Sequence, residues 1–170
     1  MKSVATSDLK TLLDEQRAQA QSASQVDWSQ RREKWLNVLR TLFDQIESWL
    51  HDAGLPDTDI RRGEREIVEE TLGRYIAPTM TVQLPNHTVI DFTPIASVII
   101  GGYGRVDVTA QRGLQKYYLI AIDADEGNRP QGAPSYTRNW VWRIFEPGNP
   151  RKSINFDVTG LTELLAKLSG

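Results

Sequence analysis

The sequence predicts an α+β fold with an N-terminal helical pair, a mainly antiparallel β-meander of six or seven strands, and a C-terminal helix. Three observations lead to this class. Apolar residues recur at helical spacing between residues 27 and 54, strand-like alternation follows from about residue 64 to 146, and a leucine stripe closes the chain. We expect the helices to cover one face of the sheet, because alternating strands bury a single face.

The length and composition of the chain indicate one compact domain. The chain has 170 residues, of which 39% are hydrophobic and 25% charged, and this is enough apolar surface for a core. We assign residues 1–55 to a helical arm that packs on the sheet, and residues 56–170 to the sheet with its C-terminal helix. The formal net charge of −2 argues against a nucleic-acid surface, which needs a concentrated positive field.

The chain contains no cysteine. This excludes a disulfide framework, a thiol nucleophile and Cys-ligated zinc. No other metal site is predicted, because residues 123–128 lack the oxygen spacing of an EF-hand loop, and His51 and His87 lie far apart in the sequence. No apolar run is long enough to cross a bilayer. We therefore expect a soluble cytoplasmic protein with no cofactor and no membrane association.

The first helix is predicted from Ser7, a residue type that caps helices, and from Leu9, Leu12 and Leu13 on one helical face. The Ala- and Gln-rich residues 18–25 can be helical but have little apolar surface to bury. We expect a solvated arm here, or an arm that becomes ordered on a partner protein or on a second copy of the chain.

The second helix is predicted between Asp27, which forms a capping-box pattern with Gln30, and Gly54. A helix of this length, roughly 40 Å, exceeds the width of the predicted sheet. One end, carrying Trp28 and then Trp35, is therefore expected to overhang the sheet and contact a partner. The alternatives are that the tryptophans fill the core, or that the first helix folds back over them.

Residues 64–72 fit two structures. Their helix propensity is high, but their apolar content is too low for a buried helix, and Gly73 suits a hairpin turn. We favour a polar edge strand, whose charges also discourage aggregation. Residues 90–122 hold the densest run of β-branched residues and predict three strands, with the glycines of residues 101–104 supplying positive φ in a hairpin.

The remaining segments complete the predicted sheet and its cover. A strand is predicted at residues 138–146, a weaker extended piece at 154–158, and the long polar loop 123–137 is typical of functional loops. A closing helix over residues 161–168 is expected to start at Thr159 or Thr162. The predicted core contains eight residues: Leu42, Ile46, Trp49, Val98, Ile100, Val106, Ile120 and Trp142.

Candidate catalytic residues are Asp91, Arg105 and Asp107. Arg105 and Asp107 are two positions apart on one predicted strand, so they share a face, and Asp91 on a neighbouring strand can lie across from them. Carboxylates beside an arginine can bind a polar ligand or act as acid and base, but no nucleophile or metal motif accompanies them. We favour a structural ion pair on a solvated sheet face.

Candidate contacts to a ligand or partner are, besides Trp28 and Trp35, the residues Tyr103, Trp140 and Arg143. Aromatic rings on neighbouring strands beside arginines can stack a base or a sugar. Because no basic surround accompanies these rings, we favour the interpretation that they pack under the long helix.

Three functional hypotheses remain open. The first is a non-catalytic accessory protein, such as an inhibitor or immunity-type partner, that binds another protein chain or its own copy. The second is a small-ligand binding module that uses the sheet face around Arg105 and Asp107. The third is an enzyme with an unfamiliar acid/base site. A closed pocket on that face would favour the second or third hypothesis, and a flat charged face would favour the first.

Overall fold

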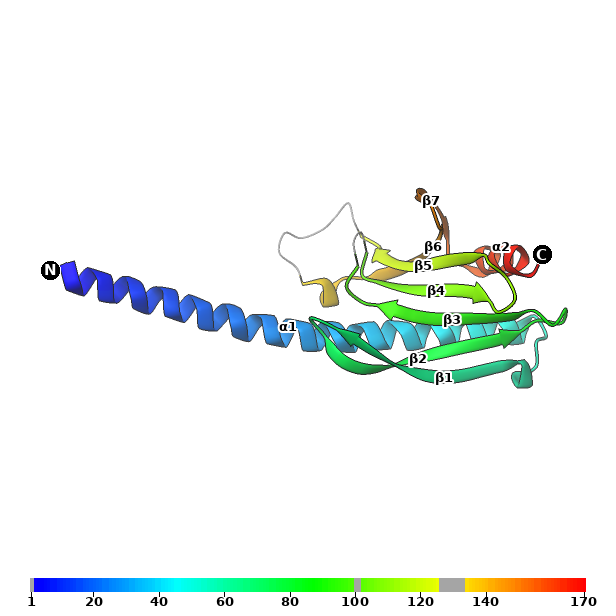
Figure 1. Ribbon diagram of the computed structural model, residues 1–170, viewed down its shortest axis with the longest axis horizontal. Coiled ribbons are helices and arrows are strands. Elements are labelled where there is room, and N and C mark those ends of the chain that lie inside the picture. The colour runs from blue at the N-terminus through cyan, green and yellow to red at the C-terminus, as the bar shows by residue number, and fades with distance from the viewer. Residues whose placement is uncertain (1, 100–101, 126–133) are drawn as a thin grey trace.

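The computed structural model describes the backbone of residues 2–99, 102–125 and 134–170, and their side chains except those of residues 2–5, 19–27 and 150. One long helix, a seven-stranded antiparallel sheet and a short C-terminal helix form this part of the chain (Figure 1). The predicted α+β class is confirmed. The N-terminal part of the long helix projects well beyond the sheet (Figure 1).

The helix α1 (Lys2–Asp52) runs without interruption for 51 residues. The predicted boundary between two helices is therefore absent, and Asp27 lies inside α1 instead of capping a second helix. The reason is that Ala and Gln in residues 18–25 have adequate helix propensity and that no Gly or Pro precedes Gly54. At 1.5 Å per residue, α1 is about 77 Å long.

The predicted helix stop at Gly54 is confirmed. Gly54 has a φ of 99°, its N–H donates to the carbonyl of His51 at 2.9 Å, and the N–H of Leu55 donates to the carbonyl of Leu50 at 2.9 Å. These two bonds define a Schellman motif, and the buried Leu50 and Leu55 provide its usual hydrophobic contact. The chain then passes through a short 3-10 helix, η1 (Asp57–Asp59), into the sheet.

The sheet is a simple meander, because its strands pair in sequence order and each is antiparallel to the next. The strands are β1 (Ile60–Glu69), β2 (Gly73–Gln83), β3 (Val89–Ala96), β4 (Gly104–Ala110), β5 (Lys116–Asp123), β6 (Trp140–Glu146) and β7 (Asn149–Asn155). A second short 3-10 helix, η3 (Ser135–Thr137), precedes β6.

The edge-strand prediction for residues 64–72 is confirmed, because most of them belong to β1 at one edge of the sheet and Gly73, with a φ of 73°, follows the turn. Two boundaries differ from the prediction. β1 begins earlier, at Ile60, and β7 spans residues 149–155 instead of 154–158. Both extensions are polar and lack apolar alternation, so pairing with the neighbouring strand determines them.

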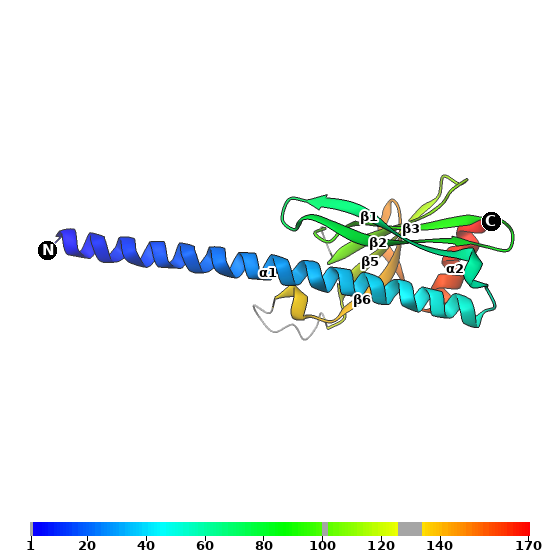
Figure 2. The same cartoon turned by 90° about the horizontal axis from the view of Figure 1, so that it is seen from below.

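Both helices pack on the same face of the sheet (Figure 2). α1 lies along this face, and α2 (Val158–Ser169) lies beside the C-terminal end of α1. The side chain of Asp157 caps α2 by accepting a hydrogen bond from the N–H of Gly160 at 2.7 Å. The predicted caps Thr159 and Thr162 are therefore wrong. The residue immediately before the helix occupies the capping position, and the leucine stripe does not locate it.

The predicted core is confirmed in part. Three of its residues are buried: Leu42, Ile46 and Val106. Three are partly buried: Trp49, Ile120 and Trp142. Val98 is wrong, because its side chain is 45% exposed. β3 ends at Ala96, and this valine lies in the bend that follows the strand. Ile100 and residues 126–133 of the predicted loop lie outside the described residues.

The glycines at the start of β4 allow close packing. The prediction of positive φ is wrong for Gly102 and Gly104, since neither is among the positive-φ glycines of the described chain. A Cβ atom at Gly104 would collide with the ring of Trp35, and one at Gly102 would lie 2.6 Å from Cγ2 of Ile120. Gly104 is therefore needed so that Trp35 can lie against β4. Gly101 lies outside the described residues.

Candidate functional site

The face of the sheet opposite the helices carries the predicted catalytic candidates. Arg105 and Asp107 both lie on this face of β4, as predicted from their spacing. The strand register places Thr93 of β3 opposite Asp107, and Asp91 opposite Thr109. The predicted neighbourhood of Asp91, Arg105 and Asp107 is therefore present.

Asp107 is buried and lies between two cationic side chains. Its Oδ1 is 2.8 Å from Nε of Arg105, and its Oδ2 is 3.4 Å from Nζ of Lys116. The guanidinium of Arg105 also lies over the ring of Tyr118, with its carbon 4.6 Å from the ring centroid. These three charges are thus paired within the protein, as predicted, but the Asp107 carboxylate is buried and does not lie on a solvated face.

Asp91 has its own partners on the same face. It accepts hydrogen bonds from the hydroxyl of Thr81 at 2.8 Å and from the side-chain amide of Gln111 at 3.1 Å. Further along the face, Arg143 of β6 donates to Ser153 Oγ at 2.7 Å and to the side chain of Asn155. Arg143 therefore links β6 to β7, the strand at the edge of the sheet, by side-chain hydrogen bonds.

Tyr103 and Trp140 lie on the helix-covered side, where their rings stack with centroids 4.9 Å apart and an interplanar angle of 23°. Arg31 of α1 lies beside both rings, with its guanidinium carbon 5.4 Å and 5.2 Å from their centroids. It also donates to the carbonyl of Ser97 at 2.7 Å and to the hydroxyl of Ser135. Sequence reasoning missed Arg31, because its partners lie more than 60 residues away in the chain.

Asp123 continues this cluster at the end of β5. It accepts hydrogen bonds from Nε of Arg138 at 2.9 Å and from the hydroxyl of Tyr103 at 3.0 Å. The hydrogen bond from Arg138 holds the pKa of the Asp123 carboxyl well below its usual range, against the opposing effect of burial. A charged pair therefore fixes both ends of the predicted loop 123–137.

A second buried network involves Glu69 at the end of β1. Its carboxylate accepts hydrogen bonds from the N–H groups of Ser97 at 3.0 Å and Val98 at 3.1 Å, and from the hydroxyl of Tyr75. Nε1 of Trp35 donates to the Tyr75 oxygen at 3.1 Å. Burial and the hydrogen bond to Glu69 raise the pKa of Tyr75 well above its usual range. Trp35 is fully buried, so its ring belongs to the core and not to a contact surface.

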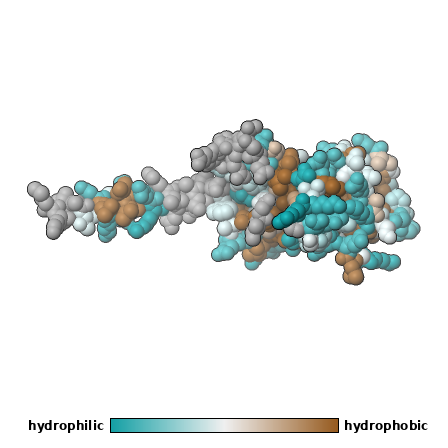
Figure 3. All heavy atoms as spheres, turned by 90° about the horizontal axis from the view of Figure 1, so that it is seen from above, coloured by the Kyte–Doolittle hydropathy of each residue, from teal (hydrophilic) through white to brown (hydrophobic). Residues whose placement is uncertain are grey.

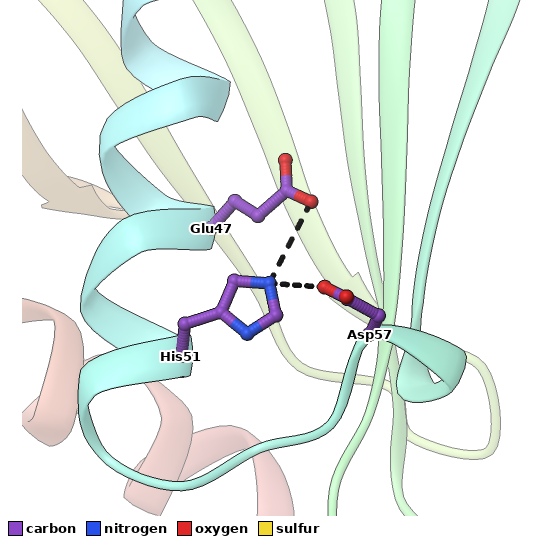
Figure 4. Close-up of side chains that lie close together, drawn as sticks. All are labelled: Glu47, His51 and Asp57. Carbon is purple, nitrogen blue, oxygen red and sulfur yellow. Dashed lines mark ion pairs between the residues drawn. The ribbon is translucent and has the colours of Figure 1, made fainter.

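A third group of titratable side chains lies where α1 turns into the sheet (Figure 4). Glu47 and His51 are one turn apart on α1, Asp57 comes from η1, and one ligand atom from each lies within 4.8 Å of the others. The sequence placed His51 in no such cluster, because only the turn at Gly54 brings Asp57 back beside it. Nη1 of Arg62 is 2.9 Å from Glu47. The ion pair between Arg62 and Glu47 therefore joins the end of α1 to β1.

The projecting part of α1 is exposed along its described length. All side chains of residues 6–18 are exposed, and among them Leu9, Leu12 and Leu13 have exposed fractions of 55%, 48% and 40%. These leucines form an apolar patch among the otherwise mostly polar side chains of residues 6–18 (Figure 3). Trp28 is partly buried against the core. We call residues 2–27 the arm.

A groove of about 580 Å³ lies beside the part of α1 that packs on the sheet. Its α1 wall is formed at helical spacing by Lys34, Val38, Thr41, Gln45 and Trp49. Its other wall contains Trp140, Trp142 and Phe156. These aromatic side chains are partly buried, so part of their apolar surface remains open to solvent. We call this hollow the tryptophan groove.

No family model, curated protein or solved structure matches this chain. Within the part of the chain that the structure describes, no helix combines the length and apolar character needed to span a membrane.

Proposed function

We propose that this chain is a non-catalytic protein-interaction module that acts in the cytoplasm, as an accessory or inhibitor-type partner, and that α1 presents its binding surface. The observation that carries the proposal is the arm. It extends about 40 Å beyond the sheet at 1.5 Å per residue, and it exposes three leucines on one face. A contiguous apolar patch of this kind on a polar surface marks a protein contact.

The sheet face supports the same proposal. A binding or catalytic site needs polar groups that remain available to a ligand. Asp107 is instead held by Arg105 and Lys116, and Asp91 is held by Thr81 and Gln111. This pairing is typical of a structural sheet face. We therefore favour protein interaction over the small-ligand and acid/base hypotheses.

The test compares two substitutions on different faces of the arm. Leu12→Glu places a charge in the leucine patch, and Thr11→Glu places the same charge about 100° around the helix, outside that patch. Both positions are exposed, so neither change disturbs the core. Tagged wild-type and variant chains are expressed with an untagged wild-type copy in cells that naturally contain the protein, cross-linked and purified, and bound chains are identified by mass and amount.

The expected result is a stoichiometric bound chain in the wild-type and Thr11→Glu samples that is lost with Leu12→Glu. It can be the untagged copy or a different protein, and either supports the proposal. Equal recovery from all three samples, or no stoichiometric chain in any of them, contradicts an interaction function of the arm.

A further inference from the structure

We infer that the partner of the arm is a second copy of this chain, and that each arm lies antiparallel in the tryptophan groove of the other copy. The inference rests on the proposed function of the arm and names its partner. The arm cannot reach the groove of its own chain, because residues 2–52 form one continuous helix. An exposed leucine patch and a groove with exposed tryptophan surface are thus available in each molecule, and only another molecule can bring them together.

The first argument concerns the face of α1. Leu9 and Gln45 are 36 residues apart, as are Leu13 and Trp49. At 3.6 residues per turn this separation is about ten turns. The leucines of the arm and the α1 wall of the groove therefore lie on the same side of one helix. A two-fold dimer in which two α1 helices run side by side requires this, because both contacts must face the same neighbouring helix.

The second argument concerns position along α1. The midpoint of Lys2–Asp52 is residue 27. The leucines are centred about 16 residues before it, and the α1 wall of the groove, from Lys34 to Trp49, is centred about 15 residues after it. A two-fold axis near this midpoint exchanges the two regions. The two α1 helices then lie side by side over their full length, and each leucine patch lies beside the groove of the other copy.

The third argument concerns shape and chemistry. The groove follows α1 for 16 residues, about 24 Å, which suits a helix lying alongside α1. Three leucines spaced at i, i+3 and i+4 form the kind of stripe that packs into a groove between a helix and aromatic side chains. Its aromatic wall provides the large apolar surfaces that typically anchor protein interfaces.

The fourth argument concerns the area of the contact. An arm about 40 Å long and about 10 Å wide covers about 400 Å² on each of the two surfaces that meet. The two-fold axis repeats this contact, so the dimer buries about 1,600 Å² in total, within the range of stable specific interfaces.

The first experiment measures the oligomeric state of the purified full chain by sedimentation velocity and light scattering over a wide range of concentration. The wild-type chain is expected to dimerise. Leu12→Glu in the arm and Thr41→Glu in the groove are each expected to raise the dimer dissociation constant by about 100-fold, because every dimer carries the substitution twice. The matched controls Thr11→Glu and Arg40→Glu change residues outside these surfaces and should dimerise as the wild type does.

The second experiment uses the absence of cysteine in the natural chain. Leu12→Cys and Thr41→Cys proteins are mixed and treated with a short bis-maleimide cross-linker. The antiparallel arrangement predicts covalent dimers that contain one chain of each kind. Circular dichroism and thermal melting of every variant confirm that it remains folded.

Three results would overturn the inference: a wild-type chain that stays monomeric at all concentrations, a dimer that Leu12→Glu does not weaken, or cross-links that form only between two Leu12→Cys chains. If the wild-type chain is monomeric but a different protein is bound through Leu12 in cells, the second copy is rejected as partner while the proposed interaction function stands. If no chain depends on Leu12 in cells, the proposed function fails as well.

Discussion

Gly104→Ala tests how closely α1 is fixed to the sheet. The added methyl group would collide with the ring of Trp35 and lie 2.7 Å from two of its carbons, whereas an ordinary contact is about 3.5–4.0 Å. The ring must therefore move by about 1 Å. It is fully buried, it packs against Trp142 with centroids 6.0 Å apart, and its N–H is bonded to Tyr75, so it has little room to move.

The expected destabilisation follows from these contacts. Overpacking a buried position costs about 1–3 kcal/mol, and losing the hydrogen bond to Tyr75 costs about 0.5–1.5 kcal/mol more. Replacing glycine by alanine restricts the unfolded chain, which offsets about 0.4–1 kcal/mol. We expect Gly104→Ala to lower the free energy of unfolding by about 2–3 kcal/mol.

Urea denaturation followed by tryptophan fluorescence and circular dichroism measures this change. The matched control is Gly113→Ala, where the new Cβ would lie 3.5 Å from Cβ of Ala110, an ordinary contact. Its free energy of unfolding should change by less than about 1 kcal/mol. In a Trp35→Leu background the cost of Gly104→Ala should fall by at least about 1 kcal/mol, because the colliding ring is gone. A Gly104→Ala cost below about 0.5 kcal/mol, or an equal cost in both backgrounds, would refute the packing argument.

Two further predictions concern stability. Leu42→Ala removes a buried side chain where α1 meets the sheet and should cost about 2–5 kcal/mol in urea denaturation; a loss below about 0.5 kcal/mol would show that α1 does not pack there. Because Arg138 lowers the pKa of Asp123 in the folded state, ionised Asp123 stabilises the fold above its unfolded pKa, near 3.8, and this contribution disappears as the pH falls below that value. The melting temperature of Asp123→Asn should therefore lie below that of the wild type at neutral pH and approach it in acid, and a constant difference from pH 7 to pH 2 would contradict this role.

The spacing of apolar residues determined most of the fold class. The stripe that includes Leu42 and Ile46 identified the core-facing side of α1, and Gly54 identified its end, because both depend on neighbouring residues along the chain. The boundary between two helices was predicted wrongly from residues 18–25. Low apolar content shows that a segment buries little, but it does not show that the segment leaves the helical conformation.

In the candidate site, too, some features could be predicted from neighbouring residues and others could not. The common face of Arg105 and Asp107 was predictable, because the side-chain period of a strand is fixed. The clusters around Arg31, Glu69 and His51 were not, because each combines residues from different elements. No local pattern distinguishes a buried arginine that holds two loops from an exposed one on a polar helix face.

The sequence by itself therefore determined the class of fold, the order of its strands and a helical face near the N-terminus that carries three leucines. Only the tertiary structure decided that these leucines extend beyond the sheet on the same helix that walls the tryptophan groove, and on the same side of it. The physical reason is that local periodicity sets which face of an element is apolar, whereas the straight course of a 51-residue helix sets where two distant faces lie relative to each other.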